Sequence, residues 1–395
     1  MASPAASADK PSSAAAALPA GFRADLGSTL DSIVAASIAD GVAPGASLFV
    51  SRHGSTVHAA SYGHLATHAP AASSDVNSTK VSGSTLWDVA SLTKVVATTT
   101  ALMLLEEQGK LSLDASVASY LPGLTDPSKA TITVRQLLTH SAGFEAFSDL
   151  HKTCAGREEY LAAINTRPLL CEPGSRMVYS DWDFILLQMV VESVTKQPLD
   201  IFTREQLWVP LGMTDTCFNP APELKPRIAP TEIQEARGGM VHGSVHDENA
   251  HALGGVAGHA GLFSTAEDLG KFGAMMLGGG STSTGQHILR PSTIARWTAR
   301  QGLLSSRALG WDTPSSNSSA GRFLSPRSFG HTGFTGTSLW ADPQSGILIV
   351  LLSNRVHPTR DNQKIFALRR DVADAVCEAI RDQPLIDWEA REEAK

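Results

Sequence analysis

Residues 88–111 read DVASLTKVVATTTALMLLEEQGKL. Apolar residues fill the first turns and Gly109 closes the stretch, which predicts a helix that stops at this glycine. Ser91 and Lys94 interrupt the apolar run three residues apart, so both are expected on one face near the helix start. A lysine is almost never fully buried without a partner. Lys94 therefore either extends its ammonium group to water or has a chemical role.

The segments on the two sides of this helix differ in character. Upstream, residues 24–40 have helical spacing, and the β-rich stretches GASLFVSRHG and STVHAASYGH meet at His53-Gly54, which indicates a hairpin. Downstream, the pattern is mostly helical as far as about residue 280. After residue 305, β-rich stretches flank a turn at Asp342-Pro343, and residues 360–382 form an amphipathic helix.

This order predicts an α/β fold of the α+β type. Both chain ends build one antiparallel sheet flanked by terminal helices, and an all-helical lobe is inserted between them. An active site is expected in the cleft between the lobes. The predicted divisions are a disordered, Ala/Ser/Pro-rich leader at 1–21, a sheet lobe at 22–85 and 285–395, and a helical lobe at 86–284.

Composition excludes several partners. The 395 residues carry a formal net charge of −7 without a basic block, which argues against nucleic acid. The longest strongly apolar run, GILIVLL, is too short to span a membrane. The N-terminus lacks the pattern of a signal peptide, so a cytoplasmic location is expected, or a periplasmic or secreted one if a signal has been removed. A Cys154–Cys171 disulfide remains open for an exported protein, and no oligomeric state is predicted.

Ser91 and Lys94 form a Ser-x-x-Lys pattern, which can activate a hydroxyl group without a histidine. A lysine desolvated by apolar neighbours loses proton affinity and can relay a proton. The pattern alone is weak, because Ser7–Lys10 and Ser193–Lys196 also match it. The first lies in the leader, and the second ends a helix, where the dipole favours a cation rather than a nucleophile. For Ser91 the alternative is a helix cap followed by a lysine that reaches water.

Two further motifs support a catalytic role. MVYSDWDF places Tyr179 and Asp181 just before an apolar helix, and FGHTGFTG places His331, Thr332 and Gly333 in a strand. Together with STLWDVASLTK, ITVRQLLTHSAGF and GGVAGHAGLFSTAEDL, these motifs resemble the serine penicillin-recognising hydrolases. This group includes class C β-lactamases, DD-carboxypeptidases and related carboxylesterases, and the resemblance covers roughly residues 25 to 380.

The resemblance implies a β-lactamase/transpeptidase-like fold and an acyl-enzyme mechanism. Ser91 would attack a carbonyl carbon, and Tyr179, close to a charged Lys94, would take the serine proton and return one to the leaving group. The main-chain N–H groups of Ser91 and Phe334 would form the oxyanion hole. His331 would line the strand side of the site.

Thr332 and Gly333 complete the strand triplet in this resemblance, and Thr332 would touch a substrate carboxylate or the tyrosine. The sequence departs from the family at two positions. Asp181 stands where an asparagine is usual, and an ionised carboxylate can only accept a hydrogen bond, although it could pair with Lys94. His331 stands where many β-lactamases have lysine, and it would be mostly uncharged at pH 7.

These departures predict that small neutral esters are preferred over anionic β-lactams. An alignment of Ser180-Asp181-Trp182 with the Ser-Asp-Asn loop of class A β-lactamases is also possible. Those enzymes use a glutamate base in a later Glu-x-x-Leu-Asn motif, which this chain lacks after residue 181, so Tyr179 is preferred as the base.

Other clusters have simpler interpretations. The residues from His246 to His251 could hold a metal ion, but their spacing is not that of His-Glu-x-x-His, and a loop at the edge of the cleft is favoured. His140 is interpreted as a packing residue. Four large aromatic residues are assigned to the core or the cleft wall: Trp87, Phe144, Trp182 and Trp340.

The sequence thus predicts a serine hydrolase that acts through an acyl-enzyme on small-molecule esters, amides, β-lactams or peptides. No metal or organic cofactor is implied. The alternatives are a D-alanyl-D-alanine carboxypeptidase, or a catalytically silent protein of this fold that serves as a sensor or binding module.

Overall fold

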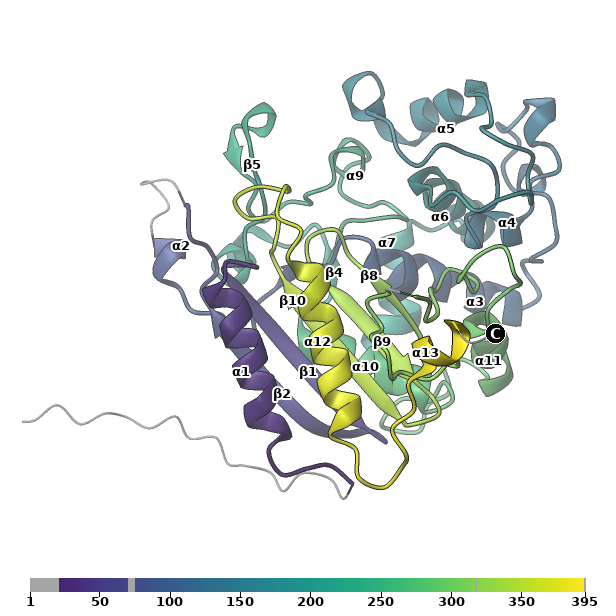
Figure 1. Cartoon of the computed structure of the whole chain (residues 1–395). Coiled ribbons are helices and arrows are strands. Elements are labelled where there is room, and N and C mark those ends of the chain that lie inside the picture. Colours follow the sequence, from purple (N-terminus) through teal and green to yellow (C-terminus); the bar gives the residue numbers. More distant parts are fainter. Residues whose placement is uncertain (1–20, 70–74, 317, 394–395) are drawn as a thin grey trace, which may run out of the picture.

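The structure is a computed structural model, and it describes residues 21–69, 75–316 and 318–393 (Figure 1). The predicted leader, residues 1–21, lies outside the described residues except for Gly21. The chain folds around one five-stranded sheet, which lies between terminal helices on one face and the helical part of the chain on the other (Figure 1).

The sheet combines both ends of the chain, as the sequence predicts. Its strand order is β2-β1-β10-β9-β8, and all neighbouring pairs are antiparallel. Because the N-terminal hairpin pairs with β10, neither chain end can form the sheet alone. The strands are β1 (Gly45–Arg52), β2 (Ser55–Gly63), β8 (Phe329–Thr332), β9 (Ser338–Asp342) and β10 (Ile347–Ser353).

The two predicted turns are confirmed. His53 and Gly54 alone connect β1 to β2, and their φ values of 48° and 78° match the backbone twist that a two-residue hairpin needs. Between β9 and β10, the Asp342 carboxylate accepts hydrogen bonds from the Gln344 N–H and the Ser345 hydroxyl. These side-chain bonds close the second turn.

Two terminal helices, α1 (Leu26–Ala39) and α12 (Ile365–Glu378), lie side by side on one face of the sheet (Figure 1). The other face is covered by α10 (Ala266–Leu277), where a Cβ on Gly273 would stand 2.4 Å from the Leu348 side chain. This glycine lets the helix approach the sheet closely. The packing therefore assigns α10 to the sheet lobe, whereas the sequence placed it in the helical lobe at 86–284.

The helical part of the chain shares its hydrophobic core with the sheet. Trp87, Phe144 and Trp182 are buried in that common core, and Trp340 is buried under α1 and α12, so the assignment of all four to the core is confirmed. No helix in the described ranges has the length and apolar character needed to cross a membrane.

The remaining helices and strands are mostly short. The α-helices are α2 (Asp75–Ser78), α3 (Thr100–Glu107), α4 (Val134–Leu138), α5 (Gly156–Thr166), α6 (Asp181–Thr195), α7 (Leu199–Thr203), α8 (Val209–Leu211), α9 (Glu248–Ala252), α11 (Pro291–Thr298) and α13 (Trp388–Glu393). The short strands are β3 (Trp87–Asp88), β4 (Cys217–Phe218), β5 (Ile233–Gln234), β6 (Gly239–Met240) and β7 (Leu262–Ser264).

The helix predicted in residues 88–111 is present but is not uniform. A π-helix at Lys94–Thr99 precedes α3, and the helical path ends before Gly109, which has a positive φ of 68°. Ala90, directly before Ser91, has a φ of 48°, a strained value for a residue with a Cβ. Such strain at one residue next to a candidate nucleophile indicates a functional constraint.

Candidate active site

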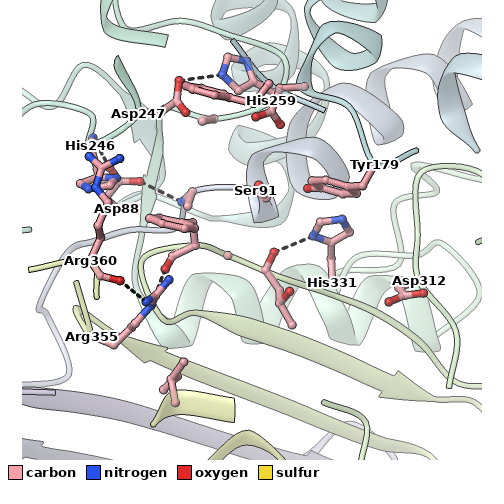
Figure 2. Close-up of a pocket in the computed structure, with 18 of the residues that line it drawn as sticks. Asp88, Ser91, Tyr179, His246, Asp247, His259, Asp312, His331, Arg355 and Arg360 are labelled. Atoms are coloured by element: carbon pink, nitrogen blue, oxygen red, sulfur yellow. Dashed lines mark hydrogen bonds and ion pairs between the residues drawn. The ribbon is translucent and has the colours of Figure 1, made fainter. Parts of the chain in front are cut away.

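Ser91 lies in a turn between β3 and the helix, and side-chain hydrogen bonds hold this turn in place. The N–H of Ala90 donates to the Asp88 carboxylate, and the hydroxyls of Thr335 and Thr337 donate to the carbonyls of Asp88 and Val89. The two threonines belong to the connection between β8 and β9. These bonds hold the strained backbone so that Ser91 faces a cavity of about 520 Å³ (Figure 2).

Lys94 is fully buried behind Ser91, and its ammonium group has three partners. Its Nζ lies 3.0 Å from Ser91 Oγ, 2.7 Å from Asp181 Oδ1 and 3.3 Å from the His259 carbonyl oxygen. The pairing of Lys94 with Asp181 agrees with the possibility raised by the sequence. The interpretation of Lys94 as a lysine that only reaches water is wrong.

The structure favours a charged Lys94, the state that the family resemblance implies. Burial by itself would lower the pKa of Lys94, but the charge of Asp181 and the phenol of Tyr179 outweigh it and raise that pKa. The loss of proton affinity that desolvation alone would cause is therefore overcome, because the Asp181 carboxylate at the start of α6 meets Lys94 in the fold. Lys94 stays charged at neutral pH and donates to Ser91 Oγ rather than taking its proton.

We expect Asp181→Asn to lower the free energy of unfolding by about 2–3 kcal/mol at pH 7. Removing one partner of a buried pair typically costs roughly 3–5 kcal/mol, and the Asp181 side chain is 18% exposed, which reduces the loss. Because the folded pKa of Lys94 is raised, the stabilisation is complete below the unfolded pKa of about 10.4 and is lost as pH rises through the folded value. Urea unfolding at several pH values measures this.

The matched control is Asp149→Asn, which breaks an ion pair with Lys152 whose side chains are 48% and 65% exposed. Exposed pairs contribute little, so a change below about 1 kcal/mol is expected for the control. Equal losses in the two variants would contradict a special role of Asp181 in stabilising the buried ammonium group.

Tyr179 lies beside Ser91 in the same cavity (Figure 2). Its ring centroid is 4.4 Å from that of His140, 4.9 Å from Lys94 Nζ and 5.0 Å from the guanidinium carbon of Arg307. Two cations therefore lie near the ring. Their charges would stabilise negative charge that develops on the phenol oxygen during a reaction.

His140 packs against the Tyr179 ring, and it is buried and does not line the cavity. Its Nδ1 lies 2.8 Å from Asp183 Oδ2 and also accepts a hydrogen bond from the N–H of Ser180. Burial lowers the pKa of His140 well below its usual value and raises the pKa of Asp183, so burial disfavours the charged form of each group. This geometry agrees with the packing role expected for His140.

The strand triplet ends β8 on the opposite wall. His331 Nδ1 lies 2.8 Å from the Thr332 carbonyl oxygen and donates to it, which leaves Nε2 to accept from Arg307 Nη1 at 3.4 Å. Burial, followed by the positive charge of Arg307, holds the pKa of His331 well below its usual value. His331 is therefore neutral at pH 7 and cannot itself provide a fixed charge.

Arg307 is the cavity residue that sequence reasoning missed. It comes from a loop 24 residues before His331, and no motif surrounds it. Its nearest carboxylate is that of Asp312, with Nη2 and Oδ2 3.8 Å apart, and its Nε is buried without a hydrogen-bond partner in the described part of the chain. A cation with one long ion pair among the described residues thus lines the cavity beside Tyr179.

The expected oxyanion donors are unoccupied. Within the described ranges, the main-chain N–H groups of Ser91 and Phe334 donate no hydrogen bond. The neighbouring N–H of Gly333 differs, because it donates to the Thr337 carbonyl oxygen at 2.7 Å. Both residues line the cavity, so the two free N–H groups are available to a reacting carbonyl group.

The segment from His246 to His251 begins at the edge of this cavity, as expected, but it is a loop only as far as Asp247, because α9 begins at Glu248. His246 pairs with Glu232, Asp247 with His259, and Glu248 with Arg360. These partners lie far along the chain and were not identified from the sequence.

A cluster of candidate metal ligands also lies at this edge of the cavity. Within the described ranges, Asp181, Asp247 and His259 place ligand atoms within 4.8 Å of one another. Lys94 pairs with Asp181, and Asp247 pairs with His259, so each of these side chains already has a partner.

Two other patterns in the sequence lie away from the cavity. Ser193 donates its hydroxyl to the Tyr120 carbonyl oxygen, and Lys196 ends α6 with a φ of 59°, so this Ser-x-x-Lys match is a helix terminus. Cys154 and Cys171 are free thiols, so the disulfide left open for an exported protein is not formed.

Comparison with known proteins agrees with this architecture. A protein-family model described as Beta-lactamase matches residues 30–374. A protein of Escherichia coli (strain K12), named "Putative D-alanyl-D-alanine carboxypeptidase", is 39% identical over 316 residues, which cover 72% of this chain and 73% of the relative. A Salmonella schwarzengrund protein of the same name is 36% identical over 311 residues, or 71% of this chain and 72% of the relative.

Solved structures show the same fold. EstCE1, described as a hydrolase with promiscuous acyltransferase activity, aligns with a TM-score of 0.71 at 22% identity over 89% of this chain and 98% of its own. A class C beta-lactamase aligns with a TM-score of 0.71 at 18% identity over 89% and 96% of the two chains. The predicted β-lactamase/transpeptidase-like fold is confirmed, and this chain belongs to the beta-lactamase family of serine hydrolases.

Proposed function

We propose that this protein hydrolyses peptides that end in a free carboxylate, as a D-alanyl-D-alanine carboxypeptidase does, through an acyl-enzyme at Ser91. The observation that carries the proposal is Arg307, a permanent cation beside Tyr179 and His331 whose one ion pair in the described part of the chain, with Asp312, is long at 3.8 Å. A guanidinium group binds a carboxylate well because its donors match the two oxygens. The name shared by the relatives from Escherichia coli and Salmonella supports the same substrate class.

This proposal reverses the substrate preference expected from the sequence. That expectation depended on a negatively charged Asp181, on its lack of an amide donor and on the absence of a fixed cation near His331. Lys94 balances the charge of Asp181, and Arg307 supplies the cation. Both electrostatic reasons for disfavouring an anionic substrate are therefore removed, while position 181 still lacks an amide donor.

The chemistry follows from the positions of the side chains. Ser91 Oγ attacks the scissile carbonyl carbon, and Tyr179 in its phenolate form takes the hydroxyl proton while Lys94 remains charged. The N–H groups of Ser91 and Phe334 stabilise the oxyanion. When the peptide bond breaks, Tyr179 passes the proton to the departing amine, and Ser91 is left as an ester.

Hydrolysis of that ester reverses the roles. A water molecule attacks the acyl carbon, and Tyr179 takes one of its protons. The tetrahedral intermediate then collapses, Ser91 Oγ leaves and recovers the proton, and the shortened peptide is released as a carboxylic acid. No group outside this cluster and the water is needed to balance the reaction.

A second candidate activity is the hydrolysis of apolar esters. Phe147, Phe334 and Phe366 line the cavity, and they are 42%, 48% and 55% exposed. Exposed aromatic rings around one cavity favour an apolar acyl or alcohol group. The same nucleophile and the same oxyanion donors would serve this reaction.

We expect Arg307→Gln to lower kcat/KM for a D-alanyl-D-alanine peptide by about 10- to 100-fold. A hydrogen bond to a charged group contributes roughly 1.5–3 kcal/mol, and the variant loses that bond with the substrate carboxylate. The measurement compares this peptide with the same peptide carrying a C-terminal amide. The wild type should prefer the acid strongly, and the variant should treat acid and amide more equally.

Arg300→Gln is the matched control. Arg300 donates to Thr313 Oγ1 and to the Pro314 carbonyl oxygen outside the cavity, so its removal should leave the preference unchanged. If the wild type cleaved the amide as fast as the acid, or cleaved only a neutral p-nitrophenyl ester, the carboxypeptidase proposal would be rejected in favour of the esterase.

A further inference from the structure

Two buried arginines hold the connection between β8 and β9. Arg369, on α12, donates through Nη2 to the carbonyl oxygens of Gly333 and Thr337, both at 2.8 Å. Arg355, just after β10, donates through Nε to the carbonyl oxygen of Phe334 at 2.8 Å. Arg355 approaches the cavity from the side of the sheet (Figure 2). The two arginines thus bind the three carbonyl groups that surround the free Phe334 N–H.

Neither arginine forms an ion pair with a carboxylate among the described residues, although the charge of Glu232 acts on Arg355. Arg355 is 3% exposed and Arg369 is 5% exposed. Burial and the charge of Arg355 lower the pKa of Arg369 to about 9. A buried guanidinium group without a counter-charge costs folding free energy. Such a cost at the wall of an active-site cavity points to a role in the reaction.

The peptide unit between Gly333 and Phe334 explains what that role is. The Gly333 carbonyl and the Phe334 N–H belong to one planar group and point in opposite directions. When Arg369 fixes the carbonyl oxygen on the side of α12, it also fixes the direction of the N–H on the cavity side. A hydrogen bond to the carbonyl oxygen polarises the amide, so the N–H becomes a stronger donor.

The Ser91 N–H, which is the other expected oxyanion donor, is linked to the same connection between β8 and β9. Thr335 and Thr337 donate their hydroxyls to the carbonyls of Asp88 and Val89, directly before Ser91. The N–H groups of Ser91 and Phe334 are therefore held at a fixed separation by side-chain bonds. Arg369 and Arg355 hold the connection between β8 and β9 through its carbonyl groups.

We propose that Arg369, assisted by Arg355, is a positioning residue of the oxyanion hole. It aims the Phe334 N–H at the reacting carbonyl oxygen and places positive charge behind that donor. The inference rests on the proposed acyl-enzyme function. It does not rest on the preference for a carboxylate substrate, because an oxyanion forms on every substrate of this reaction.

The test compares Arg369→Gln and Arg369→Lys with Arg370→Gln as the control. Arg370 is the next residue on α12, and it pairs with Glu389 instead of the β8–β9 connection. The substrate is a neutral p-nitrophenyl ester, and the probe is an arylboronic acid. In the boronate complex, Ser91 Oγ forms a bond to boron, its proton passes to Tyr179, and a boron hydroxyl takes the place of the oxyanion.

We expect Arg369→Gln to lower kcat and to weaken boronate binding by the same factor, about 10- to 100-fold. Loss of a whole oxyanion donor costs roughly 10²–10³-fold, and this variant misaligns one donor without removing it. KM for the neutral ester should change less than about twofold. Arg369→Lys keeps the charge and should recover part of the loss, while Arg370→Gln should match the wild type.

Other outcomes separate the possible failures. If Arg369→Gln melted at a lower temperature but kept normal kcat per active site and normal boronate affinity, Arg369 would be a structural residue and the inference would be wrong. If Arg369→Gln did not fold, the Arg369→Lys result decides the question by the same two measurements. A wild-type protein without a boronate adduct at Ser91 would reject the proposed function together with the inference.

Discussion

Ser91→Ala is expected to reduce turnover by about 10⁴-fold or more, to the rate left by binding alone. Ser91 carries the hydroxyl that Lys94 contacts at 3.0 Å, and it lies in the same cavity as Phe334 and Tyr179. Without Oγ no acyl-enzyme can form, because no other atom of the cluster can attack the substrate carbonyl. The measurement is kcat/KM on a D-alanyl-D-alanine peptide and on a p-nitrophenyl ester.

Ser193→Ala is the matched control, because Ser193 has the same Ser-x-x-Lys spacing but bonds to a backbone carbonyl at the end of α6. It should retain wild-type turnover. If the two variants exchanged these results, the assignment of the nucleophile would be wrong. The two variants thus test whether the position of the serine in the fold, and not the Ser-x-x-Lys pattern alone, makes it the nucleophile.

The same variants separate an enzyme from a silent binding module of this fold. Wild-type protein treated with a fluorophosphonate or a β-lactam should gain one covalent adduct, located at Ser91 by peptide mass spectrometry. Ser91→Ala should gain none. A wild-type protein that bound the β-lactam reversibly without an adduct would support the sensor alternative.

Tyr179→Phe is expected to slow acylation by roughly 10²–10⁴-fold, the usual contribution of a positioned acid–base group. The substitution removes only the phenol hydroxyl and keeps the ring that packs against His140. Lys94 cannot replace it as the base, because the raised pKa of Lys94 keeps its ammonium group protonated. Rapid-mixing measurements of the acylation burst give the rate directly.

Tyr120→Phe is the control for loss of a tyrosine hydroxyl. The Tyr120 hydroxyl accepts a hydrogen bond from the Ser112 N–H away from the cavity, so acylation should stay within about twofold of the wild type. Normal acylation in Tyr179→Phe would assign the base to another group. If the acylation rate of Tyr179→Phe rose to the wild-type value at high pH, where Lys94 loses its proton, Lys94 would be the alternative base.

Much of the fold could be predicted because its signals are local. Apolar periodicity gives the helix after Ser91, and the residues His53-Gly54 give the first hairpin. The β-rich ends were enough to predict one sheet from both termini. The position of α10 was not predictable, because its helical pattern does not say which partner covers it, and Gly273 acts only where Leu348 approaches.

Some features of the candidate site could likewise be predicted from local sequence patterns, and others could not. The spacing of Ser91 and Lys94 places them together on any helix, and the order of the three motifs identified Tyr179 and the strand triplet. The charge of Lys94 could not be read from its apolar neighbours, because Asp181 reaches it from 87 residues away.

The sequence by itself therefore predicted a candidate nucleophile, and it determined the helix that follows it and the sheet built from both termini, because all of these follow from local spacing and periodicity. The tertiary structure decided the electrostatics. It brought Arg307 to His331, and it brought Arg369 to the carbonyl of Gly333 across 36 residues. Charges act on one another through space and through burial, and neither the distance nor the burial of two residues remote in sequence is set by local pattern.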